Sequence, residues 1–122
     1  MKYLLLIYSD ETQWAAMSEA EGQEIMAEYM KYTGDIHKSG NYLGGDALQP
    51  TATATSVRVR DGKRLTTDGP FAETREQLGG YYLVEARNLD EAIDIAAKIP
   101  SARIGTIEVR PVVEMGSQAQ AV

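Results

Sequence analysis

The run from Tyr3 to Tyr8 is apolar or aromatic at every position. A strand with one face in water alternates apolar and polar residues, so this run predicts a strand over Lys2–Ser9 that is covered on both faces. Helices of the same chain can cover one face. The other face needs a second cover, and a chain of 122 residues has few elements left to supply it. We therefore expect a homodimer that packs sheet against sheet.

The composition is that of one soluble domain, with 43% hydrophobic and 25% charged residues. A net charge of -6 disfavours nucleic acid as a direct partner. The absence of cysteine excludes disulfides, thiolate metal sites and a cysteine nucleophile, and one histidine among scattered carboxylates gives no metal-ligand spacing. The first apolar run is too short for a signal segment or a membrane span. We expect a cytoplasmic protein with no membrane partner, metal or cofactor.

Two helices are predicted from their ends. Ser18 and Glu21 form a capping-box pattern, and Gly40 stops the helix after Ser39. Its inner stripe is expected to hold Ile25, Tyr29, Tyr32 and Ile36, with Met26, Met30 and Thr33 beside them. The second helix is predicted to begin at Asn88 and to end at Pro100, with Leu89, Ala92, Ile93 and Ala96 as its inner face.

The remaining segments are predicted to be extended. They are Tyr42–Leu48, Thr51–Arg60, Lys63–Thr67, Gly80–Ala86 and Thr106–Val113. Asp61-Gly62 is a strong signal for a two-residue hairpin turn. The order predicts an α+β fold, namely a ferredoxin-like βαββαβ antiparallel sheet with an inserted hairpin and helices on one face. We expect the other face to be apolar at Leu4 or Tyr3, at Tyr81 or Tyr82, and at Ile107 or Val109. Residues 1–115 form the predicted domain and 116–122 a flexible tail.

The stretch from Asp68 to Tyr82 is the chemically densest in the chain. Asp68-Gly69-Pro70 predicts a turn, and Gly79-Gly80 opens an aromatic strand. The connection is longer than the usual 4–6 residues or so, which suits a loop that is held in one shape and used. We expect Phe71 to plug the core beneath this loop. An ordinary hairpin connection with solvated charges is the alternative.

Candidate site residues follow from this loop and its expected neighbours. The ligand-binding candidates are Tyr29, Asp46, Asp68, Pro70, Phe71, Glu73, Gln77 and Tyr81. The catalytic candidates are His37 as a base, and Asp68 and Glu73 as carboxylates whose acidity neighbours can tune. Each has a structural alternative: His37 as a helix-end cation, Asp68 as a turn residue, and Glu73 with Glu76 and Arg75 as a solvated ion-pair face.

Residues Asp68–Leu83 (DGPFAETREQLGGYYL) resemble the signature of the YCII-related proteins of the DGPF type, and the resemblance extends over about residues 1–114. It includes Leu4–Tyr8, Leu43–Thr55 and Gly105–Pro111. The resemblance implies a dimeric α+β barrel, no settled activity, and an association with extracytoplasmic-function sigma factors. Arg75 stands where the family usually has lysine. The YciI branch is thought to use a histidine and an aspartate at positions that fall at about Tyr29 and Ile99, so that acid–base proposal does not transfer.

Three functional hypotheses follow. The first is a dimer that binds a small molecule in a cleft between the first helix, the sheet and the Asp68–Gln77 loop, with catalysis left open. The second is a non-catalytic regulatory or interaction protein linked to a sigma factor. The third is a signature loop that serves only folding and dimerisation.

Overall fold

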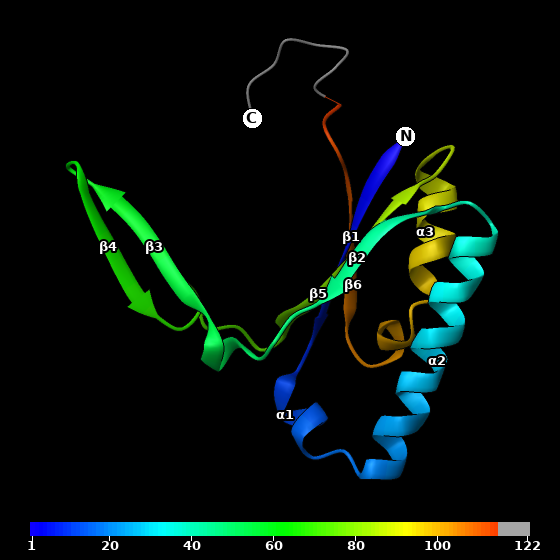
Figure 1. Cartoon of the computed structure of the whole chain (residues 1–122), viewed down its shortest axis with the longest axis horizontal. Helices are drawn as coiled ribbons and strands as arrows, with labels where there is room; N and C mark the ends of the chain where they lie inside the picture. Colours follow the sequence, from blue (N-terminus) through cyan, green and yellow to red (C-terminus); the bar gives the residue numbers. More distant parts are fainter. Residues whose placement is uncertain (115–122) are drawn as a thin grey trace.

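The computed structural model describes residues 1–114 (Figure 1). The strands are β1 (Lys2–Ser9), β2 (Tyr42–Ala47), β3 (Thr55–Arg60), β4 (Lys63–Asp68), β5 (Gln77–Glu85) and β6 (Thr106–Pro111). The helices are α1 (Glu11–Ala15), α2 (Glu19–Lys38) and α3 (Leu89–Ala97), with short 3-10 turns at Thr51–Thr53 and Pro100–Arg103. The chain is therefore an α+β fold, as the order of predicted elements indicated. The predicted tail, 116–122, lies outside the described residues.

Four strands form the main sheet in the order β2-β5-β1-β6, and each neighbouring pair is antiparallel. The central strand β1 pairs with β5 on one side and with β6 on the other. Strands β3 and β4 pair only with each other, as a separate two-stranded sheet that projects away from the main one (Figure 1). Helices α2 and α3 lie together on one side of the main sheet.

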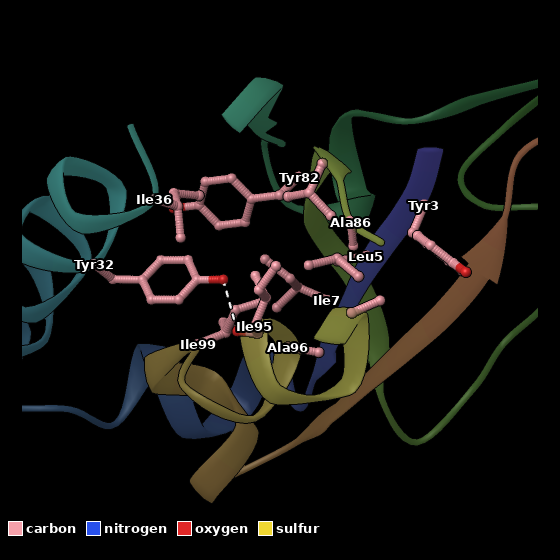
Figure 2. Close-up of a cluster of buried hydrophobic side chains, with 12 residues drawn as sticks. Tyr3, Leu5, Ile7, Tyr32, Ile36, Tyr82, Ala86, Ile95, Ala96 and Ile99 are labelled. Atoms are coloured by element: carbon pink, nitrogen blue, oxygen red, sulfur yellow. Dashed lines mark hydrogen bonds between the residues drawn. The ribbon is translucent and has the colours of Figure 1, made fainter. Parts of the chain in front are cut away.

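The hydrophobic core lies between these two helices and the sheet (Figure 2). Every second residue of β1 is buried, beginning at Tyr3, because side chains alternate between the faces of a strand. Helix α2 contributes Tyr32 and Ile36 to the core, and the Tyr32 hydroxyl donates to the carbonyl oxygen of Ile95 at 2.8 Å. This bond ties α2 to α3 inside the core.

The predicted helix ends are confirmed. The Ser18 side chain accepts from the backbone N–H of Glu21, and the Glu21 carboxylate accepts from the N–H of Ser18. Both bonds satisfy backbone donors that a helix N-terminus leaves free. Gly40 has a positive φ of 81°, as a left-handed helix stop requires, and Asn88 caps α3 by accepting from the N–H of Glu91.

The predicted hairpin turn is also confirmed. Asp61 and Gly62 have φ values of 52° and 72°. Positive φ at both central residues is the requirement of the turn type that matches the twist of a tight hairpin. Strand β3 begins at Thr55 rather than Thr51, because Thr51–Thr53 forms a 3-10 turn. Strand β5 begins at Gln77, three residues earlier than predicted.

The predicted inner faces of the helices are partly wrong. Leu89 and Ile93 are 48% and 47% exposed, whereas α3 buries Ala92, Ile95 and Ala96. Ala92 and Ala96 let α3 approach the sheet closely, with Ile95 beside them in the core, whereas Leu89 and Ile93 are turned outward. On α2, Met26 and Met30 lie outside the core and are 61% and 72% exposed.

Within residues 1–114, no helix lies over the second face of the main sheet, and we call it the open face. Its apolar residues are half-buried: Leu4, Leu6, Tyr8, Leu78, Tyr81 and Leu83. The prediction for β1 and β5 thus holds at Leu4 and Tyr81. It is wrong for β6, because Ile107 and Val109 pair with core-facing residues of β1 and pack against the core. Strand β6 instead gives Glu108 and Arg110 to the open face.

No helix within residues 1–114 combines the length and the apolar character that crossing a membrane requires.

Candidate functional site

The signature loop is tied down where it leaves the hairpin. The backbone N–H of Gly69 donates to the carbonyl of Ala54 at 2.7 Å, and the Ser56 hydroxyl donates to the carbonyl of Gly69 at 2.8 Å. Gly69 has a positive φ of 98°, which an L side chain rarely adopts, so glycine suits this turn. The predicted turn at Asp68-Gly69-Pro70 is present.

The loop is tied again where it enters β5. The Gln77 side chain accepts from the backbone N–H of Glu11 at 2.9 Å and donates to the carbonyl of Thr74 at 2.5 Å. The Thr106 hydroxyl donates to the Glu76 carboxylate at 2.9 Å. The loop is therefore fixed to α1 and to the start of β6, and its contacts lie away from α2.

Between these anchors the loop is open to solvent. Phe71 is 82% exposed, so the prediction that it plugs the core is wrong. Asp68, Pro70 and Glu73 are also exposed. Within residues 1–114, no side-chain hydrogen bond or ion pair engages the carboxylate of Asp68 or Glu73. An aromatic ring and two free carboxylates on a loop fixed at both ends are available for contacts with another molecule.

Asp46 and Tyr81 form a polar pair on the open face, where Tyr81 lies four residues along β5 from Gln77. They are opposite each other on β2 and β5, and the Tyr81 hydroxyl donates to the Asp46 carboxylate at 2.7 Å. This hydrogen bond, and then the carboxylate charge, raise the pKa of the Tyr81 phenol, because both favour the neutral hydroxyl. Asp46 is exposed and keeps further acceptor capacity. The sequence named both residues, and the fold brings them together.

Glu11 is a part of this region that the sequence analysis missed. Its carboxylate accepts from the Thr51 backbone N–H at 2.8 Å and from the Thr51 hydroxyl at 2.6 Å. Since the N–H of Glu11 also donates to Gln77, this one residue joins α1, the turn before β3 and the signature loop. The sequence offered only a weak signal, the Asp10 cap of a five-residue helix. Hydrogen bonds from Thr12 hold the pKa of the Asp10 carboxyl below its usual range.

Two other candidates lie on the far side of the sheet. Tyr29 is on α2, where its hydroxyl is 2.5 Å from the Ser101 hydroxyl, and burial raises its pKa. His37 is exposed near the end of α2 and stacks on Tyr42 with ring centroids 3.9 Å apart. The sheet separates both from the Asp46–Tyr81 pair within one chain. The fold thus brings Asp46 and Tyr81 together and does not bring Tyr29 or His37 to them.

The helix side carries a hollow of its own, a groove of about 660 Å³ between α2 and α3. Its rim is charged but largely self-paired: Arg103 binds Glu28 at 2.8 Å, Lys31 binds Asp35 at 3.0 Å, and Arg87 binds Glu91 at 3.1 Å. Such exposed pairs are already solvated and satisfied, which leaves little for a ligand to gain. In the part of the chain that the structure describes, no group of three or more His, Cys, Asp and Glu residues could hold a metal ion.

These features define a small α+β protein whose sheet has one helix-covered face and one open face, with an exposed loop that leads into β5. The family model of the YCII-related domain matches residues 1–116. An uncharacterised protein of Rhizobium meliloti (strain 1021) is 37% identical over 113 residues, which cover 91% of this chain and 91% of that protein. The chain belongs to the YCII-related family.

Proposed function

We propose that this chain is a homodimer that packs its open sheet faces together and binds a small molecule beside the signature loop. The strand order β2-β5-β1-β6, with α2 and α3 on one side, is the order expected of a ferredoxin-like sheet. Six half-buried apolar or aromatic residues on the open face support the dimer, because a contiguous apolar surface of this kind is typical of an interface.

The observation that carries the ligand proposal is the loop held at both ends with its centre exposed. The centre presents the Phe71 ring and the Asp68 and Glu73 carboxylates, and the strand that follows the loop carries the Asp46–Tyr81 pair on the open face. Carboxylates accept hydrogen bonds, and an aromatic ring packs against an apolar group. The proposed ligand therefore carries a cationic or hydrogen-bond-donating group on an apolar body. Whether it is also transformed is left open by the site chemistry.

A metabolite screen by thermal shift tests this proposal. A ligand that binds only the folded chain raises its stability by about 2.7 kcal/mol at one hundred times its Kd. We expect Glu73→Ala and Asp68→Ala to weaken the binding of such a ligand. Asp94→Ala, on the helix-side groove, is the matched control and is expected to leave binding unchanged. A ligand whose binding is not weakened by either Asp68→Ala or Glu73→Ala would contradict the proposed site.

The exposed Phe71 ring also favours a second function, that of a non-catalytic protein that contacts another protein, such as a component of a sigma-factor pathway. In that case a protein partner co-purifies from the native host and is lost with Phe71→Ser. A stable partner in the absence of any small-molecule response would favour this function over ligand binding.

A further inference from the structure

Within residues 1–114, the rest of the chain buries almost none of the β3–β4 hairpin. Of its twelve strand residues only Ser56 is partly buried, and the others are exposed. A two-stranded hairpin is at best marginally stable alone in water. Its turn is nevertheless well formed, and its two ends are held together by hydrogen bonds from Gly69 to Ala54 and from Ser56 to Gly69. A closed hairpin that projects from its own body (Figure 1) is placed to contact another one.

The two faces of the hairpin differ in character. The alternation of side chains puts Val57 and Val59 on one face, opposite Thr66 and Arg64, and the valines are 59% and 62% exposed. The other face carries Arg58 and Arg60, with Leu65 opposite Arg58 in the register. The valines are adjacent on their face, so they offer a small continuous apolar strip.

The charge of the hairpin is opposite to that of the rest of the chain. Residues 55–68 hold four basic and two acidic side chains, which leaves eight basic and sixteen acidic side chains elsewhere. The hairpin thus has a net charge of +2, and the rest of any second copy has a net charge of -8. Opposite charge speeds encounter and selects the partner. A polyanion such as nucleic acid is less suited, because the molecule as a whole is acidic.

We propose that the β3–β4 hairpin is an arm that packs its Val57–Val59 face on the body of a second copy of this chain. Electrostatic attraction between the cations of the hairpin and the acidic body favours the encounter, and burial of the two valines stabilises the contact. The signature loop begins at the last residue of the arm, Asp68, so docking of the arm also places that loop against the second copy. The proposed ligand site then lies at the contact between two chains. This inference rests on the proposed dimer.

The test compares two hairpin variants by sedimentation and by hydrogen exchange. Val57→Thr with Val59→Thr keeps β-branched side chains but removes apolar surface, so we expect the dimer Kd to rise about tenfold. Leu65→Thr on the opposite face is the matched control, with an expected change of at most about twofold. Amides of residues 55–68 are expected to exchange more slowly in the wild-type dimer than after dilution to the monomer. Added salt is expected to slow the association of monomers into the dimer, because it screens the attraction between the hairpin and the second body.

The failures are distinguishable. Two results would overturn the arm and leave the proposed dimer standing. In the first, the double valine substitution leaves the dimer Kd unchanged. In the second, Leu65→Thr raises that Kd as much as the double valine substitution does. Amides of residues 55–68 that exchange as fast in a proven dimer as in the monomer would also overturn the arm. A wild-type chain that never dimerises removes the proposed dimer and the arm together.

Discussion

Tyr32 is the residue that joins the most parts of the core. Its ring packs edge to face on Tyr82 with centroids 5.3 Å apart, and its hydroxyl donates to the Ile95 carbonyl (Figure 2). Tyr32→Phe keeps the ring but leaves that buried carbonyl without this donor. We expect a loss of about 1–2 kcal/mol in the free energy of unfolding, measured by urea titration.

Tyr42→Phe is the matched control for that substitution. No hydrogen bond of the Tyr42 hydroxyl is present among the described residues, so the expected change is within about 0.5 kcal/mol. An equal loss in both variants would mean that the Tyr32 hydrogen bond contributes nothing particular.

The buried phenols also predict how stability depends on alkaline pH. Burial raises the pKa of Tyr29, Tyr32 and Tyr82 above the ordinary value. A group whose pKa is raised on folding contributes stability that is fully present below its unfolded pKa, about 10 for tyrosine, and is lost as pH rises through the folded pKa. Urea unfolding should therefore show stability falling above about pH 10. Tyr32→Phe should flatten that fall, and an unchanged slope would contradict this assignment.

At the residue scale the sequence identified chemistry better than orientation. Ser18 with Glu21 and Asp61 with Gly62 were predictable, because each pattern acts within four residues of chain. Phe71 was not, since apolar character alone does not say whether a loop residue points inward. Glu11 was missed because its partners, Thr51 and Gln77, are 40 and 66 residues away in the chain.

At the scale of elements, the contact between β1 and the turn before β6 leaves no room for a side chain. A Cβ on Gly105 would lie 2.1 Å from the Tyr8 carbonyl oxygen, which is far inside van der Waals contact. Gly105→Ala should therefore push the end of β6 away from β1. We expect a loss of about 1–3 kcal/mol in the free energy of unfolding, as for other overpacked sites.

Gly34→Ala is the matched control, because no atom of the described residues outside its chain neighbours and the nearby backbone of α2 lies within 4 Å of the added Cβ. Alanine is a better helix former than glycine, so this variant should be more stable by about 0.5–1 kcal/mol. Thermal unfolding of the two variants side by side gives the comparison. Equal destabilisation of both would contradict the close approach at Gly105.

The arrangement of elements was largely predictable, and the facing of their side chains was less so. Ile107 and Val109 alternate with Glu108 and Arg110 along β6, and pairing with β1 decides which set faces the helices. Likewise, α3 packs through Ala92, Ile95 and Ala96 rather than through its larger residues Leu89 and Ile93. Which residues of a helix or strand face the core depends on how closely two elements approach, and the sequence of one segment does not determine that distance.

At the scale of the whole molecule, the proposed dimer and its ligand site depend on what covers the open face. The unbroken apolar run of β1 is explained on one side by the helices, which bury Tyr3, Leu5 and Ile7. On the other side Leu4, Leu6 and Tyr8 remain half-buried. The Asp46–Tyr81 pair of the candidate ligand site lies on this face, so a second copy over it would also cover that pair.

Sedimentation of the wild-type chain over a range of concentrations, beside Leu6→Lys, tests that claim most directly. The wild type should sediment at twice the chain mass, and Leu6→Lys, which places a charge on the open face, should give a folded single chain. Leu89→Lys, on the exposed side of α3, should remain a dimer. A wild-type chain that stays single at the highest concentration reached would contradict the account.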